Sequence, residues 1–211
     1  QIPKIGISFA RSEKFLTDIA VMAARGAREA EIAAKVLADV ARAINGVEVR
    51  TEILFLQALS SGYALVNDET NPNAGIRGDF GYLDENKFEA IAAAWSNVAS
   101  AKPLDDIDQL FEKANTDGNT IAEVFLSRKY FNYLRNSEQG KTLAAQYAGQ
   151  VIVNPANLLQ PSRNAILAAL EDNYGARFTI VDSSFRTENK AGETTTVKPW
   201  VEDAVVAVPS S

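Results

Sequence analysis

Aspartate and glutamate are the residues of this chain whose type and grouping could do chemistry. One group follows Pro103 and a second surrounds a run of turn residues nearer the amino end. Paired carboxylates act as general acid and base when burial moves their pKa values apart, and clustered carboxylates can bind cations. The first group is Asp105, Asp106, Asp108 and Glu112, and the second is Asp68, Glu69, Asp79 and Asp84.

Solvation accounts for both groups more simply than catalysis does. The first falls at a predicted helix start, where the helix dipole favours negative charge, and it occupies the outer face of that helix. The second fits no EF-hand loop. We therefore predict no catalytic, cofactor-binding or metal-binding residues and no cofactor. A carboxylate-dependent hydrolase that uses residues among Asp79, Asp84 and Asp105 is an alternative.

The chain contains no cysteine and no histidine. That composition removes disulfides, thiolate zinc sites, Ser-His-Asp and Cys-His nucleophiles and imidazole proton shuttles. The formal net charge is −6 and the basic residues are dispersed, which argues against a protein that binds tightly to the nucleic-acid backbone. The aromatic group Tyr130, Phe131 and Tyr133 beside Arg128 and Lys129 is therefore interpreted as core packing rather than as a base-stacking platform.

Length and apolar content bound the architecture. With 211 residues, 46% of them apolar, the chain can bury a core as one domain or two small ones. Its most apolar windows, such as 201–209, fall short of the roughly 20 residues that span a bilayer. The first four residues do not begin a signal peptide. Because the chain starts without methionine and stops just after a strand-like run, we expect a fragment or a processed form.

Apolar periodicity predicts two helices in the amino-terminal part. The first runs from Thr17, its N-cap, to Ile44 and stops at Asn45-Gly46. The second begins at Thr51 and ends at Ser60-Ser61-Gly62. The apolar row of the first helix consists of Ile32, Val36, Val40 and Ile44.

A hairpin and two further helices are predicted next. The hairpin joins Tyr63–Val66 to Ile76–Tyr82 through a turn at Asn71–Gly75. One helix opens at Asp84 or Asn86, and another opens at Pro103. The apolar faces of these helices are Phe88, Ile91, Ala92 and Trp95 in the first, and Leu104, Ile107, Leu110 and Phe111 in the second.

The carboxyl-terminal half mixes helices with short strands. Thr120–Leu126 fits either a strand or a capped helix, and 128–135 is helical. The mixture, with strands that are mostly antiparallel and no regular βαβ alternation, predicts the α+β class. The remaining predicted elements are a brief strand at Val151–Val153, a helix capped by Ser162 and ended by Gly175, a strand at Arg177–Val181 that turns at Asn189–Gly192 and returns through Thr194–Val197, and a last strand at Val205–Val208.

A series of short motifs follows an order that is typical of one family. These motifs are Arg50, Glu52, Leu56-Gln57-Ala58-Leu59 and Gly62, then Asp79-Phe80-Gly81, Trp95, Pro103-Leu104-Asp105-Asp106-Ile107, Gly118, Ser127 with Phe131 and Leu134, Tyr174-Gly175, Val181-Asp182, Lys198-Pro199-Trp200 and Val205 to Pro209. In order and spacing the stretch from Thr17 to Pro209 resembles the lambda-like major head (major capsid) proteins of tailed bacteriophages. No single motif carries the likeness.

The resemblance implies a Hong-Kong-97-like phage capsid fold and a structural, non-enzymatic protein. Its spine helix would be Thr17–Ile44, its peripheral domain residues 1–85 with a returning strand in 198–211, and its axial domain residues 86–197. Copies would form pentamers and hexamers of an icosahedral shell that encloses DNA, in the virion and, during assembly, in the host cytoplasm. A cellular, encapsulin-like shell protein is the main alternative.

The resemblance also bears on partners and on the ends of the chain. It suggests a scaffold or maturation protease and a decoration protein as further partners, with no sequence-specific nucleic acid and no membrane. The family has an extended arm and a long loop before the spine helix and further strands after the position of Pro209. About sixteen residues precede Thr17 here. We therefore predict that these 211 residues fold but do not close into shells.

Overall fold

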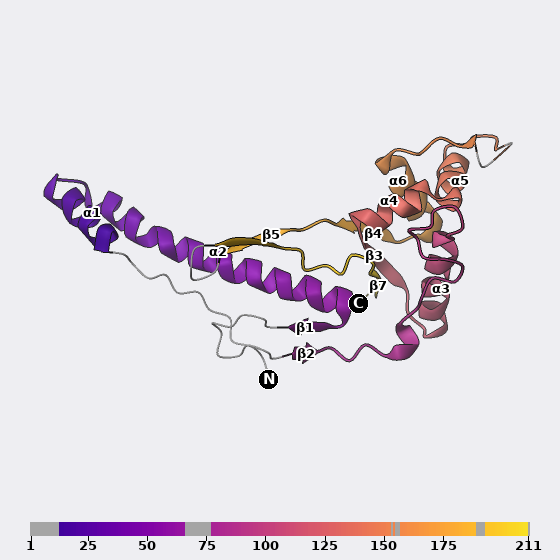
Figure 1. Ribbon diagram of the computed structural model, residues 1–211, viewed down its shortest axis with the longest axis horizontal. Helices are drawn as coiled ribbons and strands as arrows, with labels where there is room; N and C mark the ends of the chain where they lie inside the picture. The colour runs from indigo at the N-terminus through magenta and orange to yellow at the C-terminus, as the bar shows by residue number, and fades with distance from the viewer. Residues whose placement is uncertain (1–12, 66–76, 153, 155–156, 189–192, 211) are drawn as a thin grey trace. The chain divides into compact units, whose positions relative to one another are not determined.

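The structure, a computed structural model, describes residues 13–65, 77–152, 154, 157–188 and 193–210. Helices and strands are mixed without regular alternation, so the predicted α+β class is confirmed. Chain contacts define two compact units, one of Gln1–Leu56 with Ala64–Gly78 and the other of Gln57–Tyr63 with Asp79–Ser211. The elements are α1 (Glu13–Ala24), α2 (Glu29–Ser61), β1 (Tyr63–Leu65), β2 (Arg77–Asp79), the short 3-10 helix η1 (Asp84–Asn86), α3 (Pro103–Thr116), β3 (Ile121–Ser127), α4 (Arg128–Asn136), α5 (Glu138–Tyr147), α6 (Arg163–Tyr174), β4 (Arg177–Val181), β5 (Phe185–Glu188), β6 (Thr194–Val197) and β7 (Val205–Pro209) (Figure 1).

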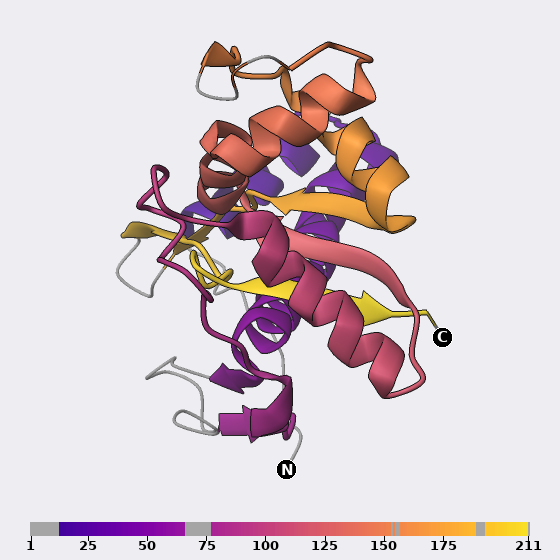
Figure 2. The ribbon, with the colours of Figure 1, turned by 90° about the vertical axis from the view of Figure 1, so that its right-hand side faces the viewer.

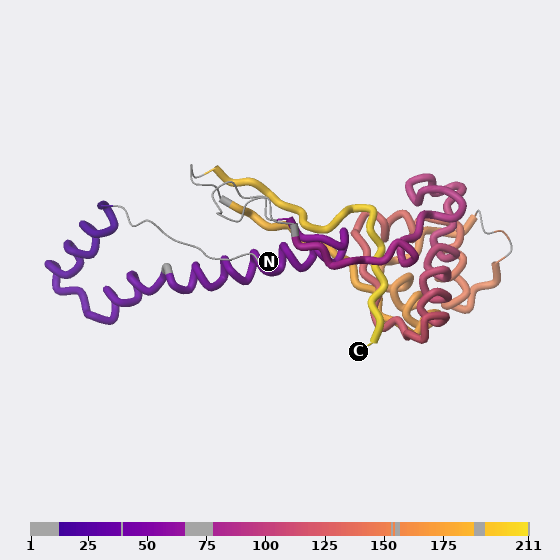
Figure 3. Tube along the Cα trace, turned by 90° about the horizontal axis from the view of Figure 1, so that it is seen from below, coloured from indigo at the N-terminus to yellow at the C-terminus, as the bar shows by residue number. Residues whose placement is uncertain are grey.

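The amino-terminal helices divide at a different point from the one predicted. Helix α2 runs through Asn45-Gly46 without a break for 33 residues, about 50 Å at the usual rise (Figure 3). The break lies instead between α1 and α2, at Gly26, whose φ is 75°. A glycine inside a helix costs only about 1 kcal/mol relative to alanine, so Asn45-Gly46 is too weak a stop signal to end a helix of this length.

Thr17 is not a helix cap. It lies inside α1, where its hydroxyl donates to the Glu13 carbonyl at 2.9 Å. Helix α1 is tied to α2 by an ion pair between Lys35 and Asp18 at 3.4 Å. The Lys35 ammonium also lies 5.9 Å from the centre of the Phe15 ring. The structure therefore has two helices in contact, α1 and α2, where the apolar periodicity predicted a single continuous helix from Thr17 onward.

The predicted pairing of the two short strands is confirmed, because β1 and β2 form a two-stranded sheet. Its predicted turn at Asn71–Gly75 lies outside the described residues. Gly62 ends α2 with φ 77°, a left-handed conformation that glycine adopts without strain. Its carbonyl then accepts from Phe80 N at 2.9 Å, which fixes the chain just after β2.

The helix predicted to open at Asp84 or Asn86 is wrong. Only η1 forms there, and residues 87–102 follow a path of bends and turns. Trp95 is buried, but Ile91 is 59% exposed, so these residues do not share an apolar face. Polar contacts to α3, described below, hold this segment and outweigh the helical propensity of its alanines.

A three-stranded sheet in the order β4-β3-β7 organises the second unit (Figure 2). Strand β3 settles the ambiguity at Thr120–Leu126 in favour of a strand, with Val124 and Leu126 fully buried. It pairs in parallel with β4, where Val124 lies opposite Phe178, and antiparallel with β7, where Val124 lies opposite Ala207. The sheet is therefore mixed rather than wholly antiparallel.

The predicted pairing of Arg177–Val181 with Thr194–Val197 is wrong. The first segment, β4, is the parallel partner of β3, while the second, β6, pairs antiparallel with β5. A parallel pair needs a long crossover, and α4, α5 and α6 supply it between β3 and β4. The sequence pattern marked both strands correctly but carried no information about this crossover.

The helices of the crossover are capped by serine. Ser127 begins α4, Ser137 begins α5 and Ser162 begins α6, each accepting a backbone N–H from three residues on. Helix α6 ends at Gly175 as predicted, with φ 65°. The strand predicted at Val151–Val153 is wrong for its described part, since Val151 and Ile152 belong to no strand and Val151 is 90% exposed. The core consists of Trp95, Ile107, Ile121, Val124, Leu126, Phe131, Leu134, Ala144, Ile166, Leu170, Ala176 and Phe178.

Candidate functional site

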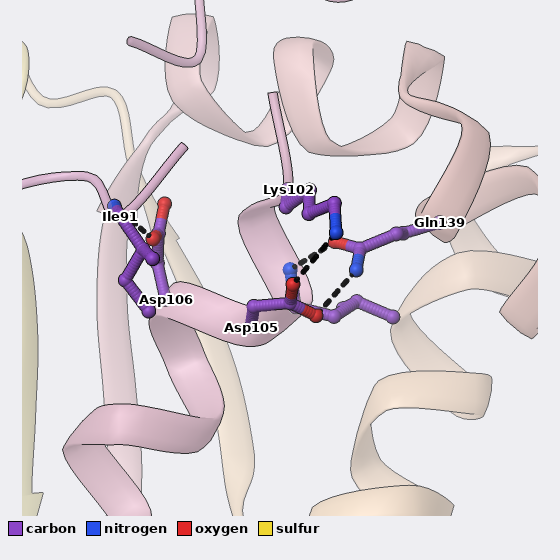
Figure 4. Close-up of polar contacts among 6 residues, drawn as sticks. Ile91, Lys102, Asp105, Asp106 and Gln139 are labelled. Atoms are coloured by element: carbon purple, nitrogen blue, oxygen red, sulfur yellow. Dashed lines mark hydrogen bonds and ion pairs between the residues drawn. The ribbon is translucent and has the colours of Figure 1, made fainter. Parts of the chain in front are cut away.

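The carboxylate group at the start of α3 is the first candidate site, and Asp106 is its best-connected member. One of its oxygens accepts from Ile91 N at 2.8 Å (Figure 4). The other accepts from Trp95 Nε1 at 2.6 Å. Hydrogen bonds to an ionised acceptor are among the stronger ones in proteins. Asp106 therefore fixes the irregular segment 87–102 onto α3, which is a structural role.

Asp105 is held by different neighbours. Gln139, from α5, donates through Nε2 to Asp105 at 2.5 Å and accepts from Leu104 N at 2.9 Å (Figure 4). Lys102 lies 3.7 Å from the other Asp105 oxygen. One glutamine thus binds a carboxylate and an otherwise unsatisfied backbone N–H in the first turn of α3.

Asp108 supports a half-buried tyrosine. The Tyr174 hydroxyl donates to Asp108 at 2.7 Å and lies 3.4 Å from the Leu104 carbonyl. Burial, together with the hydrogen bond to Asp108, raises the pKa of Tyr174 far above its ordinary value. The Tyr174 ring packs on Phe111 and Phe178, with centroids 4.7 and 5.8 Å away. This pair therefore joins α3 to α6 rather than forming a reactive centre.

The hydrolase alternative placed Asp79, Asp84 and Asp105 in one site, yet each has a different partner. Asp79 accepts from Gly81 N at 2.9 Å, Asp84 pairs with Lys87 at 2.6 Å, and Asp105 binds Gln139. The hydrogen bond and charge of Lys87 lower the pKa of Asp84, whereas a general acid needs a raised pKa. Asp68 and Glu69 lie outside the described residues.

The aromatic and basic residues of α4 are used in packing and ion pairs. Phe131 is buried in the core, and the Tyr130 ring lies 5.3 Å from Trp95. Arg128 pairs with Asp182 at 2.6 Å, and Lys129 pairs with Glu202 at 2.7 Å, which raises the pKa of Lys129. Core packing was the predicted role of this group, and the burial of Phe131 confirms it.

The described part of the second unit contains an open groove of about 1020 Å³. Its sides come from α3, β7 and the segment 81–95. Leu110 and Ala114 contribute from the helix, and residues 203–209 contribute along the strand. The lining is mainly apolar, so the groove suits contact with a protein chain better than it suits catalysis.

The sequence pattern did not predict the residues that connect the α3 site into a hydrogen-bond network. Gln139 lies 34 positions from Asp105, and helix α5 was not predicted at all. Ser137 followed by Glu138 is a recognisable helix start, because serine caps and acidic first turns favour helices. The sequence pattern gave no indication that Asp106 accepts hydrogen bonds from Ile91 and Trp95, because these two residues belong to a segment without regular structure.

Within the residues that the structure describes, no three or more acidic side chains come together in a way that could hold a metal ion. Among the described helices, none combines the length and apolarity needed to cross a bilayer.

Comparison with solved structures defines the class of protein. The crystal structure assigned as the capsid protein of a prophage of E. coli CFT073 matches this chain with a TM-score of 0.53 and 16% identity, over 97% of this chain and 54% of that one. The fold is thus that of a phage capsid protein, as predicted. The chain spans about half the length of that structure.

The family is shown by the sequence itself. The chain belongs to the phage major capsid protein E family, whose model matches residues 1–211. This family is structural and non-enzymatic, so the prediction of no enzyme is confirmed and the hydrolase alternative is dropped. The chain shows no significant match to a protein of curated function.

Proposed function

We propose that this protein associates with copies of itself into the pentamers and hexamers of an icosahedral shell that encloses phage DNA. The single observation that carries the proposal is the match of the capsid family over all 211 residues. The family is a viral one, which favours a phage shell over the cellular shell considered from sequence. Virion localisation follows from the family, and assembly in the host cytoplasm is part of the proposal.

Surface composition supports self-association. Several large apolar side chains of the second unit are exposed, and where such side chains form a contiguous patch they mark a surface that meets other proteins. Strand β7 is an edge of its sheet, which leaves a row of backbone groups available for pairing. The exposed apolar residues include Phe80, Tyr82, Leu83, Ile91, Tyr147, Val151, Leu159 and Val201.

Charge supports enclosure of DNA without tight binding. The net charge of −6 disfavours retention of the phosphate backbone, so DNA inside such a shell would stay mobile. We expect no sequence-specific contact. Addition of duplex DNA should leave the sedimentation of the protein unchanged at moderate salt.

The division into a peripheral domain (1–85 with 198–211) and an axial domain (86–197) is also a proposal. Within that division, β7 would be the peripheral segment that pairs with an axial strand, because it is bonded to β3. A scaffold, a maturation protease and a decoration protein are proposed as further partners through the family resemblance alone.

Native mass spectrometry of the purified chain over a range of concentrations tests the proposal. We expect species of five and six copies that grow with concentration at the expense of the monomer. A chain that stays monomeric or dimeric at all concentrations would contradict the proposed function. Leu159→Asp is a first variant for testing whether a given exposed side chain takes part in the association. The Leu159 side chain is 90% exposed, so the monomer of this variant should still fold.

A further inference from the structure

Strands β5 and β6 form a two-stranded sheet that is separate from the β4-β3-β7 sheet (Figure 1). Two segments of the second unit join the two sheets. The outgoing segment, residues 182–184, leads from β4 to β5, and the returning segment, residues 198–204, leads from β6 to β7. A two-stranded sheet has little stability of its own, and Thr194 to Thr196 of β6 are exposed. The direction of the β5–β6 sheet therefore depends on how these two segments are held.

Three consecutive residues at the junction of β3 and α4 contact both segments. The Ser127 hydroxyl donates to the backbone carbonyl of Glu202 at 2.6 Å, and the Lys129 ammonium lies 2.7 Å from the Glu202 carboxylate. Arg128, between them, lies 2.6 Å from the carboxylate of Asp182. The returning segment is thus bound by Ser127 and Lys129, and the outgoing segment is bound by Arg128.

The returning segment is also held by contacts that do not depend on charge. Trp200 is 8% exposed, and its ring centroid lies 6.3 Å from that of Phe125 in β3. The Trp200 indole N–H donates to the Ala204 carbonyl at 3.3 Å, which closes a turn within the segment. The backbone N–H of Val201 donates to the Ser60 hydroxyl at 3.1 Å. Salt screens none of these contacts, so the returning segment should keep its position at any ionic strength.

The outgoing segment is held by a contact that salt does weaken. The side chains of Arg128 and Asp182 are 60% and 47% exposed. An exposed ion pair contributes little free energy, and in 1 M salt charges are screened beyond about 3 Å. Val181, which comes directly before Asp182, is buried as the last residue of β4. The outgoing segment can therefore be released without unfolding the strand that precedes it.

We propose that the ion pair between Arg128 and Asp182 is a salt-sensitive latch that fixes the direction of the β5–β6 sheet. While the pair is formed, both segments are bound to the β3–α4 junction and the sheet has one direction. When salt screens the pair, the outgoing segment separates from α4 and the sheet pivots on the returning segment. This inference goes beyond the proposed function, because the latch operates within one chain and needs no second copy.

Pulsed electron paramagnetic resonance between two spin labels tests the proposal, because the native sequence has no cysteine. The labels are attached at Thr196→Cys in β6 and Asp172→Cys in α6, which are both exposed positions. The labelled chain is diluted into unlabelled protein, so that the measured distances lie within one chain. We expect one main distance at low salt. At high salt the fraction of chains outside that distance should rise about twofold to fivefold, as the loss of an exposed ion pair predicts.

Charge variants identify the ion pair that is responsible. Arg128→Asp should broaden the distance distribution at low salt, and it should keep α4 intact because an acidic residue is favourable in the first turn of a helix. The exchanged pair Arg128→Asp/Asp182→Arg should restore the narrow distribution. Lys87→Asp, which removes an exposed ion pair with Asp84 at 2.6 Å outside both segments, is the matched control and should change nothing. Lys129→Asp should have a smaller effect than Arg128→Asp, since Ser127 and Trp200 still hold the returning segment.

Three results would overturn the proposal. They are a native distribution that does not change with salt, a distribution that is already broad at low salt, and equal broadening by Lys129→Asp and Arg128→Asp. If Arg128→Asp does not fold, as circular dichroism would show, Asp182→Asn removes the same ion pair from the other side and is judged by the same criteria. Native mass spectrometry of these variants measures self-association separately, so failure of the latch leaves the proposed function standing.

Discussion

Trp95 donates its indole N–H to Asp106 across 2.6 Å, and the other oxygen of the same carboxylate accepts from Ile91 N at 2.8 Å. Trp95 is only 4% exposed and packs beside Tyr130. One side chain at the start of α3 thus anchors a segment that has no helix or strand of its own. The wall of the groove beside β7 depends on this anchor, because residues 81–95 form that wall.

Replacement of Asp106 by asparagine should destabilise the second unit. The amide keeps one acceptor oxygen but turns an N–H₂ group toward a donor, which leaves a polar group unpaired. We expect a loss of about 1–3 kcal/mol in the free energy of unfolding. Urea titration followed by tryptophan fluorescence measures it. Glu112→Gln, on the exposed face of the same helix, should change stability by less than about 0.5 kcal/mol. Equal effects of the two variants would refute the anchoring role.

Gly140 should not tolerate a side chain. A Cβ atom there would lie 2.1 Å from the Leu134 carbonyl oxygen, a backbone atom that cannot move without shifting α4. Gly140→Ala should therefore cost about 1–3 kcal/mol or more. Gly78→Ala is the control, because the nearest atom to its added Cβ is 3.8 Å away. Thermal unfolding of both variants checks the prediction, and an undiminished melting temperature for Gly140→Ala would contradict it.

Ser137 should matter more than the other serine caps. It is fully buried, donates to the Leu134 carbonyl at 2.7 Å and accepts from Gly140 N at 3.0 Å. Ser137→Ala would leave Gly140 N without its side-chain partner in a site closed to water and would remove one of the two hydrogen bonds at the Leu134 carbonyl, which still accepts from the backbone N–H of residue 137. We therefore expect a loss of about 2 kcal/mol. Ser162→Ala removes an exposed cap and should cost less than about 1 kcal/mol. Chemical denaturation ranks the two, and the reverse order would show that burial does not decide the cost.

Tyr174 should make stability fall at alkaline pH. Its pKa is raised in the folded protein, chiefly by burial, above the ordinary value of 10.0. Its contribution is therefore complete below pH 10, and it is lost as pH rises above 10 because the unfolded chain then releases the proton first. Tyr174→Phe should be less stable than the native protein by about 1 kcal/mol at neutral pH. Its stability should decline less between about pH 9 and pH 11.

Urea midpoints measured across that alkaline range compare the two proteins. Tyr147→Phe is a matched control, since the Tyr147 side chain is exposed to solvent. If Tyr174→Phe and the native protein decline in parallel, another group governs the alkaline loss of stability.

Local sequence signals were sufficient to predict many of the helices and strands. Pro103 and the acidic turn after it marked α3, Ser162 and Gly175 marked both ends of α6, and the apolar runs marked β4 and β7. In each case a cap, a turn residue or a periodic face lies within a few positions of the element that it defines. These contacts are short-range, so the sequence pattern contains them.

Long-range contacts decided the parts that sequence did not predict. The segment 87–102 is alanine-rich, yet its path depends on an acceptor in α3. The partner of β3 depends on a crossover of three helices, and the partner of Asp105 comes from one of them, α5. Helix α2 continues through Gly46, because the cost of one glycine inside a helix is too small to end it. The spacing of residues in the sequence does not show whether the local propensity or the long-range contact decides the structure of each segment.

Negative-stain electron microscopy of the purified 211-residue chain, with class averages tested for rotational symmetry, addresses the central claim most directly. The account predicts rings with fivefold and sixfold symmetry and, from these residues alone, no closed particles. Regular closed shells would contradict the prediction about closure but support the capsid function. Fields that contain only isolated monomers, at concentrations where the protein is folded, would contradict the claim that this chain is a self-associating shell subunit.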